Sequence, residues 1–152
     1  MRAVPIALTL LVLPAPAAAQ DMCAALNRVA AAALEEPAFA SLGDRREEVV
    51  PGFNQGCWIS HPQEGPTLVC SRGQFAPESL IAEALGRRVR DCLSAVPQPP
   101  ARPFDRGLRY MTRDLVITVS SHCSERCHVG RSAMLKVRRR IASDGPQASD
   151  PR

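Results

Sequence analysis

The chain has 152 residues, 45% of them hydrophobic, and a formal net charge of +4 at pH 7. This length is enough for one domain with a single core, and one domain is what we expect. The basic excess favours acidic partners without requiring them. Aromatic residues make up only 4% of the chain, so it lacks the interleaved basic and stacking side chains typical of nucleic-acid binding, and we expect no nucleic-acid partner.

Residues 1–19 have the pattern of a cleavable export signal. Arg2 supplies a positive charge, residues 4–13 form an apolar core, and Ala17, Ala18 and Ala19 provide the small side chains at which a signal peptidase cuts. Prolines interrupt the apolar run, which is shorter than the ~20 residues that a membrane-spanning helix needs. We therefore expect a mature chain that begins at or near Gln20, is periplasmic or secreted, and has no membrane span.

The first elements expected after the signal are a helix and a β-hairpin. Apolar residues recur at three- and four-residue steps over residues 22–34, which predicts an amphipathic helix that contains Cys23. Residues 56–61 and 67–71 are strand-like and flank a loop rich in proline and glycine, which predicts a hairpin. If His61 faces Pro66, then Cys57 faces Cys70, at a separation of ~4.5–5.5 Å between Cα atoms that a disulfide can span.

A second helix is predicted over residues 77–93, with Pro77 in its first turn and Cys92 near its end. Antiparallel packing of the two helices would bring Cys92 close to Cys23, so we expect a second disulfide there, although six cysteines allow roughly 15 connectivities. Residues 97–103 contain four prolines and are expected to form an extended connector.

The last two elements are predicted strands over residues 114–122 and roughly 128–138, joined by a short segment that contains Cys123 and Cys127. The run Arg138, Arg139 and Arg140 ends the second of these strands. We interpret it as a charged edge that hinders strand addition, and secondarily as a weak contact for anionic surfaces. Residues 143–152 are small, polar and proline-bearing, which predicts a disordered tail.

The order helix, hairpin, helix, hairpin predicts an α+β fold of the order α-ββ-α-ββ. We expect a two-layer sandwich, with an antiparallel sheet and both helices on one of its faces, stabilised by disulfides. The predicted organisation is a signal peptide over residues 1–19, a single α+β domain over residues 20–142, and the tail over residues 143–152.

Residues 122–128 are the only segment whose pattern indicates site chemistry. His122, Cys123, Cys127 and His128 offer two imidazoles and two sulfurs, a donor set suited to zinc or copper. Cys-x-x-x-Cys-His is also one residue longer than the usual motif for covalent haem attachment. Because the other four cysteines have expected partners and oxidising compartments favour structural bridges, a Cys123–Cys127 disulfide without cofactor is the preferred interpretation.

No motif of an assembled active site occurs in the chain. The nucleophile elbow, the zinc-protease helix, the phosphate loop and the dinucleotide fingerprint are all missing from the sequence. We therefore predict a small exported binding protein without catalytic activity, acting on a protein partner. A metal or haem carrier that uses residues 122–128 is the first alternative, and a thiol-redox enzyme is the second.

Overall fold

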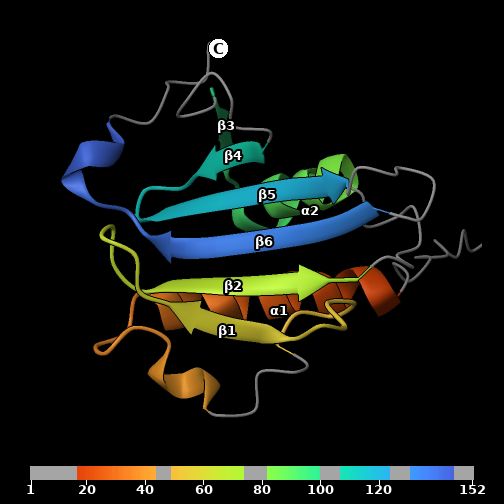
Figure 1. Cartoon of the computed structure of the whole chain (residues 1–152), viewed down its shortest axis with the longest axis horizontal. Helices are drawn as coiled ribbons and strands as arrows, with labels where there is room; N and C mark the ends of the chain where they lie inside the picture. Colours follow the sequence, from red (N-terminus) through yellow and green to blue (C-terminus); the bar gives the residue numbers. More distant parts are fainter. Residues whose placement is uncertain (1–16, 44–48, 74–81, 100–106, 124–130, 146–152) are drawn as a thin grey trace, which may run out of the picture.

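The structure is a computed structural model that describes residues 17–43, 49–73, 82–99, 107–123 and 131–145. Within these ranges it shows an α+β fold with two helices, a six-stranded antiparallel sheet and two disulfides (Figure 1). The elements in chain order are α1 (Ala17–Ala33), the 3-10 helix η1 (Ala40–Leu42), β1 (Cys57–Ser60), β2 (Thr67–Arg72), α2 (Ala82–Leu93), β3 (Val96–Gln98), β4 (Gly107–Met111), β5 (Leu115–Cys123), β6 (Arg131–Arg139) and the 3-10 helix η4 (Ala142–Asp144).

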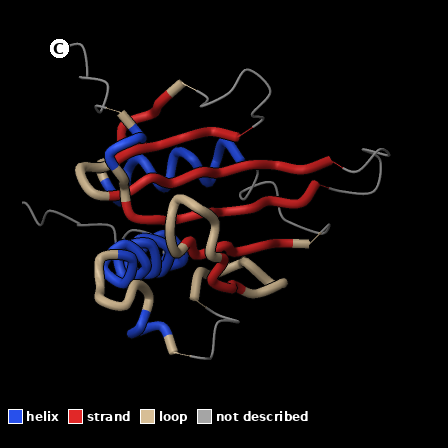
Figure 2. The backbone as a smooth tube through the Cα atoms, turned by 60° about the vertical axis from the view of Figure 1, so that its left-hand side comes forward, coloured by secondary structure: helices blue, strands red, loops and turns tan. Residues whose placement is uncertain are grey.

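The sheet has the strand order β1-β2-β6-β5-β4-β3, and every neighbouring pair is antiparallel. Figure 2 shows the same sheet from a second direction, with the strands as red tubes. The prediction of four strands is wrong in number, because β3 and β4 extend the sheet beyond β5. Part of the expected connector over residues 97–103 belongs to β3, where Pro97 is tolerated because β3 is an edge strand.

The last strand lies in the middle of the sheet, between β2 and β5. The interpretation of Arg138 and Arg139 as a charged sheet edge is therefore wrong, because both residues belong to a central strand. The strand begins at Arg131, three positions later than the predicted start at His128, and Arg131 pairs with Cys123 of β5.

Alternate positions of the strands face the core, and these positions share one cluster with the apolar sides of both helices. In Figure 1 both helices lie behind the sheet. Pairing in the register connects Leu68 to Val137, Cys70 to Leu135, and Ile117 to Val137. These side chains are at most 1% exposed and are joined in the core by Leu26, Val29, Leu85 and Val89, all fully buried.

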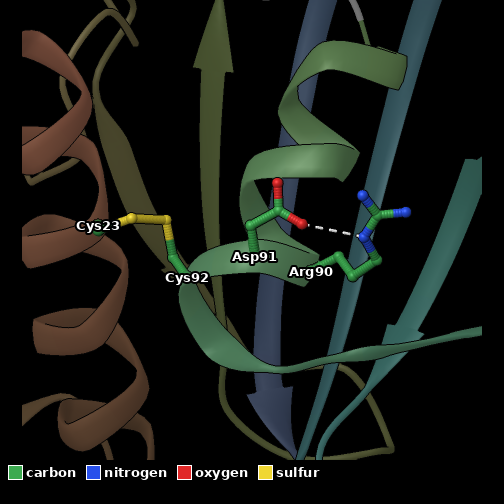
Figure 3. Close-up of a disulfide and its surroundings, with 4 residues drawn as sticks. All are labelled: Cys23, Arg90, Asp91 and Cys92. Carbon is green, nitrogen blue, oxygen red and sulfur yellow. Dashed lines mark hydrogen bonds and ion pairs between the residues drawn. A yellow bond between two sulfur atoms is a disulfide. The ribbon is translucent and has the colours of Figure 1, made fainter. Parts of the chain in front are cut away.

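The helices are held together by a disulfide between Cys23 of α1 and Cys92 of α2, with the Cα atoms 5.1 Å apart. Figure 3 shows this bond between the two helices, with the exposed ion pair of Arg90 and Asp91 on a different side of α2. The second disulfide joins Cys57 to Cys70 across the β1–β2 hairpin, where the two residues are paired in the register. Both pairings are those expected from the helix ends and the hairpin.

Two boundaries differ from the sequence-based expectations. Helix α1 begins at Ala17, so it includes the alanines of the expected cleavage pattern. Residues 143–145 lie in the predicted tail, but the structure places them in and just after η4, where Asp144 is bonded to two arginines of the sheet. Among the described helices, none combines the length and the apolar character needed to cross a membrane.

Candidate binding surface on the outer face of the sheet

The strand positions that alternate with the core positions form the outer face of the sheet. The register places them in rows across the strands, because paired residues lie side by side and point to the same face. The outer face consists of Val96, Gln98, Arg109, Met111, Val116, Thr118, Ser120, Met134, Lys136, Arg138, Ser71, Val69, Thr67, Ser60 and Trp58. None of these side chains belongs to the core cluster that includes the helices, although Thr67, Val69, Met111 and Val116 are buried on this face.

Trp58 is the largest apolar side chain exposed on this face. It lies on the edge strand β1 and is 43% exposed, whereas its register partner Val69 on β2 is only 5% exposed. Lys136 of β6, on the other side of Val69, is exposed. Tryptophan combines a large apolar area with a single N–H donor and is enriched among residues that dominate binding energy at protein interfaces.

The charges carried by the strands on this face are all positive. Lys136 lies in the central strand, Arg138 lies two residues further along it, and Arg109 lies on β4 across Thr118 of β5. At the described outer positions of the strands there is no carboxylate. The strands therefore present a positive field to anything that approaches this face.

One carboxylate reaches these arginines from outside the sheet. Asp144 of η4 accepts hydrogen bonds from both terminal nitrogens of Arg138, at 2.7 and 2.5 Å, and from Arg109 at 2.8 Å. Its side chain is 5% exposed, against 17% for Arg109 and 16% for Arg138. The hydrogen bonds from Arg138 hold the pKa of Asp144 below its ordinary value, and its burial opposes this shift.

The arginine run at the end of β6 does not form one patch. Arg138 binds Asp144, Arg139 forms an exposed ion pair with Glu36 at 2.9 Å, and Arg140 donates to the backbone carbonyl of Gly145. Arg138 and Arg140 are thus engaged by two adjacent residues, Asp144 and Gly145, while Arg139 is engaged by a distant part of the chain. The anionic contact predicted for these three residues stays a prediction.

The segment with the metal and haem alternatives lies largely outside the described residues. The backbone of His122 and Cys123 belongs to β5, where His122 pairs with Ser132, while Cys127 and His128 lie outside the described ranges. The Cys123–Cys127 bridge and its cofactor alternatives therefore stay predictions. Within the described part of the chain, no three His, Cys, Asp or Glu side chains gather in a group that could hold a metal ion.

Arg72, at the end of β2, is a buried cation that sequence reasoning did not single out. It pairs with Ala133 on the core side of the sheet and is 7% exposed. Among the described residues its Nε has no hydrogen-bond partner, and burial lowers the pKa of its guanidinium. Arg72 points away from the outer face and takes no part in the surface described above.

Sequence analysis also did not identify Arg109 and Arg138 as a pair that binds one carboxylate. Arg109 is 35 residues from Asp144 in the chain, and only the pairing of β4, β5 and β6 brings it near Arg138. The alternation of Met134, Lys136 and Arg138 with Ala133, Leu135 and Val137 is the one sequence signal that marks the outer face.

Comparison with known proteins gives no match to a family model, to a curated protein or to a solved structure.

Proposed function

We propose that the chain is a small exported binding protein without catalytic activity, and that it binds a protein partner through the outer face of its sheet, in the periplasm or outside the cell. In this proposal the helices and the sheet form two layers, so that the helices cover one face of the sheet and the other face is left for the partner. The proposal has three supports: the exposed indole of Trp58, the positive charges on the same face of the sheet, and the two disulfides.

The exposure of Trp58 is the observation that carries the proposal. A sheet residue with 43% of its surface exposed leaves a large apolar area in water. Complete burial of a large apolar side chain contributes about 1.5–3 kcal/mol, so a partner that covers Trp58 gains a substantial part of this free energy. In the same row of the outer face, Lys136 lies two strands from Trp58 and Thr118 lies three strands away, and they add polar groups of the kind that surround such an anchor in protein interfaces.

The disulfides support the proposed location of the chain in the periplasm or outside the cell. Two disulfides indicate an oxidising setting such as the periplasm or the outside of the cell, since thiols in the cytosol are kept reduced. The export signal over residues 1–19 accounts for how the chain reaches that setting. The bonds join α1 to α2 and β1 to β2, so they rigidify both the helical layer and the strand that carries Trp58.

Site-specific photo-crosslinking in the producing cell tests the proposal. A photoreactive residue in place of Thr118, near the centre of the outer face, should crosslink to one protein partner. The same residue in place of Glu83, which is exposed on α2, serves as the matched control and should not.

The partner identified in this way should bind the purified chain saturably, and Trp58→Ala should weaken binding by at least tenfold. Arg90→Ala, on the exposed side of α2, should leave binding unchanged. Equal crosslinking from Thr118 and Glu83, or full binding by Trp58→Ala, would show that the outer face is not the binding surface.

A further inference from the structure

We infer that Arg109 and Arg138 form a carboxylate-binding subsite of the outer face, which Asp144 fills in the isolated chain and which an Asp or Glu side chain of an acidic partner segment fills in the complex. This inference rests on the proposed function and names the chemistry of the partner. Asp144 is then an internal stand-in for the ligand.

The geometry of the two arginines is that of a receptor for a carboxylate. Arg138 forms a two-pronged contact, with its two terminal nitrogens 2.7 and 2.5 Å from the two oxygens of Asp144. Arg109 approaches one of the same oxygens at 2.8 Å from two strands away. Paired contacts of this kind give directional recognition of a carboxylate as well as binding energy.

The charge balance of the site favours acidic ligands. Two guanidinium groups meet one carboxylate, and Lys136 lies in the same strand as Arg138 with its side chain on the same face. The excess positive charge is partly sheltered, because Arg109 and Arg138 are 17% and 16% exposed. Charge complementarity therefore selects a segment with several carboxylates, of which one enters the subsite and the others face Lys136.

The segment that carries Asp144 is attached by polar contacts. The apolar residues of this segment are exposed: Ala142 of η4, and Ile141 just before it, which is 37% exposed. Besides the arginine contacts of Asp144, the segment is held by the hydrogen bond from Arg140 to Gly145 and by hydrogen bonds within its own turn. The segment's own residues thus lose little apolar burial when it leaves the sheet, and a partner carboxylate replaces the lost ion pairs with equivalent ones.

Direct binding of a synthetic hexaglutamate peptide to the full chain tests the inference. Asp144→Asn removes the internal carboxylate and should bind hexaglutamate at least tenfold more tightly than the wild type at low ionic strength. The matched control is Asp114→Asn, which changes the net charge by the same amount at an exposed turn and should leave affinity unchanged within twofold. Adding Arg109→Gln to Asp144→Asn should abolish the tenfold gain, and hexaglutamine should not bind.

Equal affinity of Asp144→Asn and Asp114→Asn for hexaglutamate would overturn the inference, since binding would then follow net charge alone. Full binding by Arg109→Gln/Asp144→Asn would overturn it as well. If Asp144→Asn does not fold, the wild type decides: hexaglutamate should shift the NMR signals of the Arg109 and Arg138 side chains and of the Ile141 amide, and unchanged signals would contradict the subsite.

The two proposals fail separately. If the natural partner requires Trp58 but binds Arg109→Gln as tightly as the wild type, the carboxylate subsite is wrong and the outer-face proposal stands. If hexaglutamate binds as expected but no partner requires Trp58, the subsite stands and the proposed function is wrong.

Discussion

Helix α2 approaches the sheet closely at Gly86, and this approach provides a sharp test of the structure. A Cβ atom added at Gly86 would overlap the hydroxyl of Tyr110 on β4, and would lie 3.0 Å from Cζ of the same ring and 3.2 Å from Cδ1 of Leu108. Tyr110 is 8% exposed, so its ring has little room to move. Burial raises the pKa of Tyr110, so the hydroxyl is protonated at neutral pH.

Two opposing effects set the expected result of Gly86→Ala. Alanine is favoured over glycine in a helix interior by about 1 kcal/mol, while overpacking in a core costs about 1–3 kcal/mol. We therefore expect Gly86→Ala to lower the free energy of unfolding by about 0–2 kcal/mol. In the Tyr110→Phe background the hydroxyl is gone, so the overpacking cost falls and the same substitution should stabilise by up to about 1 kcal/mol.

Urea denaturation followed by circular dichroism, on the wild type, both single variants and the double variant, measures this coupling. The double-mutant cycle should give an interaction of about 1–3 kcal/mol that favours the double variant, which is the overpacking cost relieved by loss of the hydroxyl. Tyr110→Phe is the matched control, since it removes the hydroxyl without adding a methyl group. If Gly86→Ala stabilised the chain equally in both backgrounds, α2 and β4 would not approach each other as closely as the structure shows.

Three further predictions concern stability. Cys57→Ala and Cys70→Ala should each lower the free energy of unfolding by about 2–5 kcal/mol, and the double variant should be little worse than either one; additive losses would contradict the shared bond. Arg72→Met, which keeps an unbranched apolar stem without burying a charge, should leave the melting temperature unchanged or raise it, and a clear decrease would indicate an ionic partner for Arg72. Because the folded pKa of Asp144 lies below its ordinary value of 3.8, its stabilising contribution is complete above that value and is lost as pH falls through the folded pKa. Acid titration of stability should show this loss in the wild type and not in Asp144→Asn.

Local patterns in the sequence predict the elements that depend on local chemistry. The β1–β2 hairpin is encoded by two strand-like runs around a loop of prolines and glycine, and the alternation of side chains places Cys57 opposite Cys70, as the structure has it. The apolar stripe of α2 and the strand of β5 are equally local. The α+β class follows from the order of these elements.

The features that depend on contacts between segments far apart in the sequence could not be predicted from local patterns. Val96 to Gln98 form a strand only because β4 lies beside them, and a segment with so many prolines has no strand signal of its own. The polar composition around Asp144 predicts disorder, yet two arginines positioned by the sheet hold this residue. Likewise, the position of β6 between β2 and β5 is a matter of topology that alternation within one strand does not reveal.

The position of β6 has a consequence for the order in which the chain is completed. Strands β2 and β5 have no hydrogen-bonded contact with each other in the sheet, and β6, which follows both in the chain and is the last of the described strands, is the one that joins them. Until Arg139 has been added, the hairpin of β1 and β2 and the strands β3 to β5 are separate parts of the sheet, each with an unpaired inner edge. Such edges are templates for pairing with other chains. Release of a chain that stops before β6 should therefore yield aggregates, whereas in the complete chain β6 pairs with both edges.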